Sequence, residues 1–284
     1  MDAYVNSEFI PLDLASLHIS DLAIQRGYGI FDFFRVKDHV PLYLNDYLDR
    51  FFHSAEVMGL QGILERERLR AVIFELIDRN KMPEAGIKMI LTGGYSPDAY
   101  VPVKGNFIIS QHQLVLPSAK QVEKGIKIIT YPYRRDIPEV KTINYIMGVW
   151  LQKKVKESNA ADVLYHLNDE VSEFPRCNFF LVSQSGTLVT SDKHILHGIT
   201  RMKVLQVGRN LGKVEERTVT LADVAHARET FLTSTTKGIL PIVQIDDRIV
   251  GDGRPGPVST ALREALAQAE GVEIEMAQQT LRVK

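Results

Sequence analysis

The sequence predicts a two-domain protein of mixed α/β (α+β) class, and three observations lead to this prediction. At 284 residues the chain is longer than one small core requires, so two domains are expected. Strand-like runs rich in β-branched and aromatic residues recur along the chain. Segments with apolar residues at helical spacing lie between them. Such a mixture favours two α/β or α+β domains, with a ligand site in the cleft between them.

The first domain is expected over residues 1–115. The run "FDFFRVKDHVPLYL" predicts two strands joined by a turn at residues 37–39. A helix should follow, with Asn45 as its N-cap, apolar residues on one face, and Gly59 at its end. Residues 69–77 carry a second helical pattern. The runs "GIKMILTGG" and "NFIISQHQLVL" then predict two buried strands.

The second domain is expected over residues 123–284. The stretch "LPSAKQVEKG" breaks the pattern, and we place an interdomain linker at 116–122. Hairpin turns are predicted at Ser185-Gly186 and Asp246-Asp247. Helices are predicted at about 143–158, 200–211 and 257–270, the last ending at Gly271. Strands are predicted from the runs "IKIITYPY", "DVLYHL", "NFFLVS", "TLVT", "TFLTST" and "PIVQID".

The composition argues against several classes of function. The formal net charge is −1 and the basic residues are dispersed, so neither nucleic acid nor an acidic membrane is an expected partner. No apolar run approaches the roughly 20 residues of a membrane span, and the first residues lack the pattern of a signal peptide. The single cysteine, Cys177, fits a reducing compartment, so a cytoplasmic protein is expected. No cysteine or histidine spacing predicts a metal site.

One lysine, Lys141, stands between a strand-like and a helix-like run in "DIPEVKTINYI". A lysine acts as a Schiff-base nucleophile when burial or positive charge favours its neutral amine. Arg134 and Arg135 precede Lys141, and a helix start near Ile143 would add partial positive charge. The alternative is a solvated surface charge, which most lysines are.

Two segments are candidates for binding a phosphate group. In "HGITRMKVLQV", Gly198, Ile199 and Thr200 open a predicted helix, whose N-terminal N–H groups and dipole attract anions. An ordinary threonine cap is the alternative. In "TFLTSTTKG", the hydroxyl residues 233–236 end a strand, and they either donate hydrogen bonds to an anion or form a solvated loop.

A carboxylate and an arginine complete the set of candidates. Glu173 precedes a buried strand that contains Asn178, and a carboxylate held there would keep a pyridine nitrogen protonated. Otherwise it is a polar turn residue. Arg50 lies at the edge of an apolar helix face and needs an anion, for which Asp46 or Asp49 would also serve.

Motifs of rival classes are missing from the sequence. It contains no GxxxxGK[ST] loop, no GxGxxG after a strand and no GxSxG. These absences argue against a P-loop nucleotide enzyme, a dinucleotide-binding enzyme and a serine hydrolase.

The order of the candidates resembles the class IV (fold type IV) pyridoxal-phosphate enzymes. The most specific motifs are K-x-x-N at Lys141, S-E-x-x-x-x-N-x-F at residues 172–180, and G-I-T-R at residues 198–201; the likeness covers about residues 21–259. The resemblance implies pyridoxal 5'-phosphate as the cofactor, Lys141 as its catalytic Schiff-base lysine and Glu173 as the partner of its ring nitrogen. The remaining cofactor-binding residues that it implies are Arg50, Asn178, Ile199, Thr200, Thr235 and Thr236.

The resemblance also implies an architecture and a reaction. The family has a small N-terminal α/β domain and a larger, strand-rich pseudo-barrel domain that binds the cofactor. It forms homodimers in which the small domain of one subunit helps to close the partner's active site. We therefore expect transfer of an amino group between an amino acid and a 2-oxo acid.

The substrate class is left open by the sequence. The short separation of Lys141 from Glu173 is similar to the D-amino acid and lyase branches, which slightly favours D-amino acids over branched-chain L-amino acids. The S-P-R-A-H carboxylate trap of the D-amino acid enzymes is replaced here by S-P-D-A-Y at residues 96–100. A lyase that releases pyruvate from an aminodeoxychorismate-like substrate, and a non-catalytic protein that binds pyridoxal phosphate, are the alternatives. The candidate substrate-binding residues are Arg26, Lys88 and Arg176 as a substitute trap, and Phe31, which stands where the branched-chain enzymes have Phe.

Overall fold

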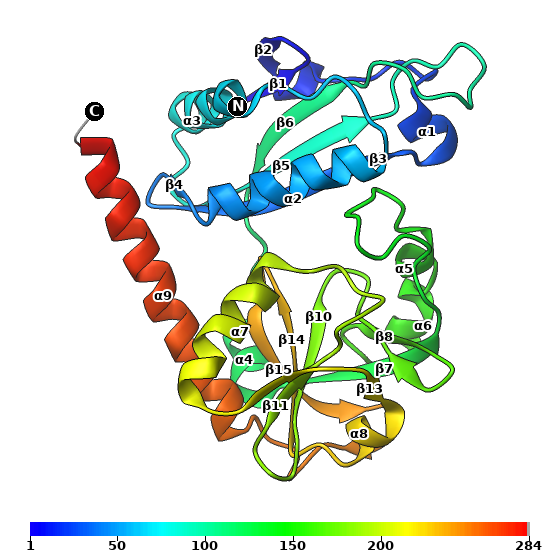
Figure 1. Ribbon diagram of the computed structural model, residues 1–284, viewed down its shortest axis with the longest axis vertical. Helices are drawn as coiled ribbons and strands as arrows, with labels where there is room; N and C mark the ends of the chain where they lie inside the picture. Colours follow the sequence, from blue (N-terminus) through cyan, green and yellow to red (C-terminus); the bar gives the residue numbers. More distant parts are fainter. Residues whose placement is uncertain (283–284) are drawn as a thin grey trace. The chain divides into compact units, whose positions relative to one another are not determined.

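The computed structural model of the chain describes residues 1–282, which form two compact units (Figure 1). Unit 1 comprises Met1–Leu114, Val140–Asn144 and the chain from Val272 onward, and unit 2 comprises Val115–Glu139 and Tyr145–Gly271. Unit 1 is therefore discontinuous in sequence. The chain comes back to it once with the short segment that carries Lys141, and again with the last turns of the C-terminal helix.

Unit 1 is built on an antiparallel sheet with the strand order β2-β1-β6-β5-β3-β4. Along β3, buried positions alternate with more exposed ones, as expected for a strand with one face on a core. Asp38 and His39 take φ angles of 51° and 64°, which form the tight turn from β3 to β4 that the sequence predicts. The strands are β1 (Asp2–Val5), β2 (Glu8–Pro11), β3 (Gly29–Lys37), β4 (Val40–Pro41), β5 (Ala85–Thr92) and β6 (Phe107–His112).

The helices of unit 1 are α1 (Leu22–Arg26), α2 (Leu44–Val57) and α3 (Arg66–Asn80), with a short 3₁₀ turn at Leu12–Leu14. Helix α2 packs on β3, and α3 packs on β1 and β6. The prediction of Asn45 as N-cap is wrong. Tyr43 holds that position with φ 52°, and the Asn45 side chain accepts a hydrogen bond from Arg70 at 2.7 Å instead.

Unit 2 is built on a mixed sheet with the strand order β12-β11-β10-β14-β15-β7-β8-β9-β13, and β16 pairs with β15. The pairs β11–β12, β15–β7 and β7–β8 are parallel. Both predicted hairpins form, one between β10 and β11 and one between β15 and β16. The strands are β7 (Ile126–Pro132), β8 (Val163–Leu167), β9 (Glu170–Val171), β10 (Asn178–Val182), β11 (Leu188–Thr190), β12 (Val214–Glu216), β13 (Val219–Thr220), β14 (Glu229–Ser234), β15 (Gly238–Ile245) and β16 (Arg248–Ile249).

Strand β10 lies at the centre of the unit 2 core, and all five of its residues are buried. Phe180 on β10 stacks on Phe231 of β14, with ring centres 5.1 Å apart and nearly parallel planes. Phe179 points into a second cluster that contains Phe174 and Leu232. The two faces of β10 thus pack against two different apolar clusters. This packing fixes the strand on both sides and holds its first residue, Asn178, in place.

The helices of unit 2 differ from the sequence predictions in several places. The expected helix at 143–158 is instead two short helices that begin at Ile146, because residues 140–144 are extended beside β3. The helix expected to stop at Gly271 continues through it. Helix α4 also forms within the stretch 116–125, with a capping box between Ser118 and Gln121. The helices are α4 (Ala119–Lys124), α5 (Ile146–Trp150), α6 (Gln152–Glu157), α7 (Ile199–Leu211), α8 (Leu221–Ala225) and α9 (Pro257–Arg282), of which α9 runs from unit 2 into unit 1.

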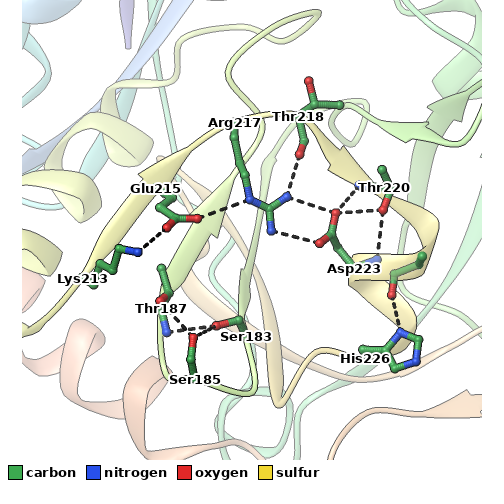
Figure 2. A network of polar contacts seen from close by, with 11 residues as sticks. Ser183, Ser185, Thr187, Lys213, Glu215, Arg217, Thr218, Thr220, Asp223 and His226 are labelled. Carbon is green, nitrogen blue, oxygen red and sulfur yellow. Dashed lines mark hydrogen bonds and ion pairs between the residues drawn. The ribbon is translucent and has the colours of Figure 1, made fainter.

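A polar network joins α8 to the neighbouring strands of unit 2 (Figure 2). The Arg217 guanidinium donates two hydrogen bonds to the Asp223 carboxylate, at 2.9 and 3.1 Å. Asp223 also closes a capping box with Thr220 at the start of α8. The hydrogen bond from Arg217 is the main cause that lowers the pKa of Asp223 to about 2. The short helix α8 is therefore anchored through a single charged carboxylate.

Across residues 1–282 every helix is too short or too polar to span a bilayer. The same residues contain no cluster of His, Cys, Asp and Glu side chains that would hold a metal ion.

Candidate active site

Lys141 lies in an extended segment of unit 1 that runs antiparallel to the start of β3. The N–H of Phe31 donates to the Lys141 carbonyl at 2.9 Å, and the N–H of Ile143 donates to the Gly29 carbonyl at 3.0 Å. The Lys141 Nζ lies 4.7 Å from the centre of the Phe31 ring. The main chain at Lys141 is therefore held by hydrogen bonds, and an aromatic ring borders its side chain.

Lys88 lies against the same aromatic ring. Strand β5 places the Lys88 Nζ 5.3 Å from the centre of the Phe31 ring, and burial lowers the pKa of Lys88. Unit 1 thus brings together three of the predicted site residues: Phe31, Lys88 and Lys141. Arg26 is not part of this group: it is exposed at the end of α1, where its guanidinium donates to the carbonyl of Gln25 at 2.8 Å.

Arg50 makes a buried ion pair with a residue that the sequence did not suggest. Its Nε and Nη2 atoms donate to the two carboxylate oxygens of Asp32, at 2.9 and 2.6 Å. The side chains of Arg50 and Asp32 are only 9% and 0% exposed. Of the predicted partners, Asp49 pairs with Arg66 at 2.6 Å instead. Asp32 follows Phe31 on β3, so this ion pair ties α2 to the strand that carries the aromatic ring.

Glu173 is held in unit 2 by two charge-assisted hydrogen bonds. The Arg135 Nε donates to Glu173 Oε1 at 2.8 Å, and the N–H of Leu196 donates to Oε2 at 2.9 Å. Glu173 is only 4% exposed. A carboxylate with two such donors is held in one orientation. The guanidinium of Arg135 is the cation that faces it.

Asn178 connects Glu173 to the start of α7 and to the end of β14. Its side-chain Nδ2 donates to the Leu196 carbonyl at 2.7 Å, so Leu196 binds Glu173 through its N–H and Asn178 through its C=O. In the antiparallel pairing of β10 with β14, Asn178 lies opposite Thr233, the penultimate residue of β14. The predicted segments 198–200 and 233–236 are therefore brought to the same place, on either side of Asn178.

The N-terminus of α7 is open. Gly198 is its N-cap residue, and no side chain caps the helix. A Cβ at Gly198 would lie 2.2 Å from the Asn178 Oδ1, so only glycine fits beside this amide. Arg201, the last residue of G-I-T-R, is buried and donates to the Ser191 carbonyl and to Glu216, both at 2.9 Å. The arginine supports the helix, and the first N–H groups of α7 are left for a ligand.

Arg134 and Arg135, which precede Lys141 in the sequence, both pair with carboxylates of unit 2. Arg134 pairs with Glu170 at 3.2 Å and Arg135 with Glu173 at 2.8 Å. Their influence on the amine of Lys141 stays a prediction. The cation that shares an aromatic ring with Lys141 is Lys88.

The other predicted residues lie on turns close to this unit 2 cluster. Arg176 is exposed on the turn whose ends, Glu173 and Asn178, form an isolated β-bridge. Thr235 and Thr236 lie in the turn between β14 and β15, and both are partly buried. Unit 2 thus brings together Glu173, Arg176, Asn178, Ile199, Thr200, Thr235 and Thr236, while Lys141, Phe31, Lys88 and Arg50 belong to unit 1.

Two partners of the candidate residues were not identified from the sequence: Asp32 as the partner of Arg50, and Arg135 as the partner of Glu173. Asp32 carries a recognisable signal, because it is an acidic residue between phenylalanines in the apolar strand "FDFF" and must find a buried cation. Arg135 carries only a weak signal, since it is one of two adjacent arginines 38 residues before its partner Glu173. Such a long-range pair follows from the fold alone.

The chemistry of the unit 2 cluster fits pyridoxal phosphate. The open N-terminus of a 13-residue helix and the neighbouring threonine hydroxyls suit a phosphate group. The Thr233 Oγ1 is buried and has no hydrogen-bond partner within the described residues. It is therefore available to a polar ligand group. A fixed, charged carboxylate such as Glu173 suits a protonated ring nitrogen.

Comparison with known proteins decides the family. The model of the family "Amino-transferase class IV" matches residues 29–245. This chain belongs to the class IV aminotransferases. The enzyme class, the fold type IV architecture and the pyridoxal phosphate cofactor that the resemblance implied are thereby confirmed.

Individual relatives of this class IV aminotransferase carry different substrate names. A "D-alanine aminotransferase" of Bacillus licheniformis is 26% identical over 272 residues, which is 94% of this chain and 96% of that protein. A "putative branched-chain-amino-acid aminotransferase" of Methanocaldococcus jannaschii is 30% identical over 275 residues, 93% of this chain and 94% of that one. The solved branched-chain aminotransferase of the archaeon Thermoproteus uzoniensis with norvaline has a TM-score of 0.87 at 21% identity, over 98% of this chain and 97% of that chain.

Proposed function

We propose that this class IV aminotransferase moves the amino group of a D-amino acid to a 2-oxo acid, with Lys141 as the lysine that binds pyridoxal phosphate. The observation that carries the residue assignment is the cluster around Leu196, in which one backbone residue binds both Glu173 and Asn178 beside the open N-terminus of α7. The bound cofactor supplies an electron sink for the charge that develops at the substrate Cα.

Glu173 would hold a proton on the ring nitrogen of the cofactor. Arg135 and the N–H of Leu196 keep its carboxylate charged and oriented, so the carboxylate favours a cationic partner at close range. This arrangement is pre-organised, since both donors to the Glu173 carboxylate come from the protein itself.

Lys141 would take the proton from the substrate Cα and deliver it to the cofactor carbon that bears the transferred amino group. Its main chain is fixed against β3, while its side chain ends beside the Phe31 ring. A rigid backbone with a four-carbon side chain lets one amine reach two atoms in turn, which proton transfer requires. The proposed phosphate ligands are Arg50 of unit 1 and, in unit 2, Ile199, Thr200, Thr235 and Thr236. Within unit 2, Asn178 holds the start of α7.

The donor amino acid is the finer part of the proposal. The short separation of Lys141 and Glu173, and the name of the Bacillus licheniformis relative, favour D-amino acids. The second candidate is a branched-chain L-amino acid, which the 30% identical relative from Methanocaldococcus jannaschii and Phe31 favour. Initial rates with D-alanine and L-leucine, each with 2-oxoglutarate, and with D-glutamate and pyruvate, separate the two. Release of pyruvate from an aminodeoxychorismate-like substrate without any oxo acid would replace the proposal by a lyase.

A substitute carboxylate trap is part of the proposal, with Arg26, Lys88 and Arg176 as its candidates. Lys88 has the best support, because its amine is partly desolvated and a bound carboxylate would offset that cost. We expect Lys88→Met to raise the KM for the amino acid roughly tenfold or more, as the loss of a charge-assisted hydrogen bond does. Lys120→Met, a change of an exposed lysine on α4, is the matched control. If Lys88→Met, Arg26→Gln and Arg176→Gln all leave the KM unchanged, the trap is wrong.

We further propose that the enzyme is a homodimer of the cytoplasm. Three apolar side chains of α5 support the dimer, because Ile146, Val149 and Trp150 are 73%, 69% and 65% exposed in the single chain. Sedimentation of the protein at micromolar concentration tests it, and a monomer would contradict it. The free thiol of Cys177 fits a reducing compartment.

A further inference from the structure

Unit 2 contains a cavity at the start of α9. It has a volume of about 560 Å³, which lies within the usual range for small-molecule sites. Its walls come from the end of α4, from β15, from the loop before α9 and from the first two turns of α9. The residues that line it are Val122, Glu123, Lys124, Pro241, Gly253, Arg254, Pro255, Ser259, Thr260 and Arg263.

The charges that line this cavity are mostly positive. Lys124, Arg254 and Arg263 face a single acidic residue, Glu123. Within the part of the chain that the structure describes, the charged group of none of these three cations takes part in an ion pair or a hydrogen bond. Unit 2 pairs many of its other cations with carboxylates, for example Arg217 with Asp223 at 2.9 Å (Figure 2). Three unpaired cations around one hollow therefore attract an anion.

The helix terminus itself does not provide this attraction. The N–H groups of Val258 and Ser259 are occupied by the buried Glu229 carboxylate, at 3.0 and 2.9 Å. The hydroxyls of Ser259 and Thr260 donate to the Gly256 carbonyl, at 3.0 and 2.9 Å. Recognition of an anion in this cavity must therefore come from the two guanidinium groups and the ammonium group.

We propose that this cavity binds a phosphorylated small molecule of nucleotide size. Two guanidinium groups suit phosphate, because each offers a planar fork of N–H donors to its oxygens. Val122, Pro241 and Pro255 supply apolar surface for a ring that the phosphates carry. The volume exceeds the needs of inorganic phosphate and suits a nucleoside diphosphate. None of the residues that line the cavity is a proposed phosphate ligand of pyridoxal phosphate, and the proposal does not depend on the proposed substrate.

The test is calorimetric titration of the enzyme saturated with pyridoxal phosphate, so that the cofactor's phosphate site is filled. ADP is the probe. Inorganic pyrophosphate, which lacks the nucleoside, reports how much of the ADP affinity comes from the phosphate charges alone. ADP should bind more tightly than pyrophosphate. The double variant R254A/R263A should weaken ADP binding by roughly tenfold or more, as expected for the loss of two charge-assisted contacts. Arg248→Ala, which removes an exposed arginine of β16 outside the cavity, should leave it unchanged.

A variant with the opposite expected sign guards against loss of fold. Glu123→Gln removes the only acidic residue of the lining and should tighten ADP binding by about two- to fivefold. Since the Arg254 and Arg263 guanidinium groups have no partners among residues 1–282, the double variant should keep the thermal stability of the wild type. No ADP binding up to millimolar concentration, or binding that R254A/R263A and Glu123→Gln leave unchanged, would overturn the proposal. Equal affinity for pyrophosphate and ADP would overturn the claim that the apolar wall of the cavity binds a ring.

Discussion

The ion pair between Arg50 and Asp32 is expected to stabilise the fold independently of any cofactor. Asp32 is fully buried. Its carboxylate accepts two hydrogen bonds from the Arg50 guanidinium, and the N–H of Phe33 donates to it at 2.8 Å. Arg50→Met keeps the length and the apolar part of the side chain but leaves the carboxylate without its cation. Loss of one partner of a buried pair typically costs about 3–5 kcal/mol.

This free energy corresponds to a large shift in the melting temperature. At roughly 2–4 °C per kcal/mol for a chain of this size class, the lower bound of 3 kcal/mol predicts a decrease of about 6–12 °C for Arg50→Met. Arg66→Met is the matched control, because Arg66 pairs with Asp49 at a similar distance, 2.6 Å, but these side chains are 36% and 66% exposed. An exposed pair contributes less than about 1 kcal/mol, so its variant should melt within about 4 °C of the wild type.

Thermal unfolding of the apoprotein, followed by circular dichroism, is the assay, because it removes any contribution from phosphate binding. The double variant D32N/R50M should recover about 1–3 kcal/mol of the loss, since it leaves no unpaired charge in the interior. If Arg50→Met melts like Arg66→Met, or if the double variant is destabilised by the sum of the single changes, the reasoning is refuted.

The other predictions concern unit 2. Gly198→Ala should weaken pyridoxal phosphate binding roughly tenfold, because the new Cβ would lie 2.2 Å from Asn178 Oδ1. A fluorescence titration of the apoprotein that gives the wild-type dissociation constant would contradict this. Glu173→Gln should lower kcat by roughly 100-fold or more, since the neutral amide no longer stabilises a protonated ring nitrogen; a kcat within threefold of wild type would count against the assignment. Asp223 has a pKa of about 2, below its ordinary 3.8, so its contribution to stability is present above pH 3.8 and is lost as the pH falls toward 2. Asp223→Asn should therefore melt lower at neutral pH and depend less on pH between 4 and 2; parallel melting curves would contradict this.

Local patterns were sufficient to predict most of the elements that carry the site. Apolar residues at helical spacing predicted α2 and α3. The polar residues between two strand-like runs predicted the Asp38-His39 turn between β3 and β4. Gly271 was misread as a helix stop. A glycine inside a helix costs only about 1 kcal/mol relative to alanine, and the buried Leu266 and Ile274 on either side of it continue the apolar face of α9.

The contacts that orient the site could not be predicted in the same way. Arg50 and Asp32 are 18 residues apart, and Arg135 and Glu173 are 38 residues apart, so their pairing depends on how strands and helices pack. The position of Lys141 illustrates the same limit. A charge-crowded helix start was expected from its neighbours in sequence, whereas the structure has an extended segment paired with β3 that brings Lys141 to Phe31.

The most direct test of the central claim is to locate the cofactor on the chain. The enzyme loaded with pyridoxal phosphate is reduced with borohydride, digested, and its peptides are mapped by mass spectrometry. We predict a pyridoxyl-phosphate label on Lys141, and the loss of both the label and the visible absorption band of the bound cofactor in Lys141→Ala. A label on Lys88, whose amine lies beside the same Phe31 ring, or no label on any lysine, would contradict the account.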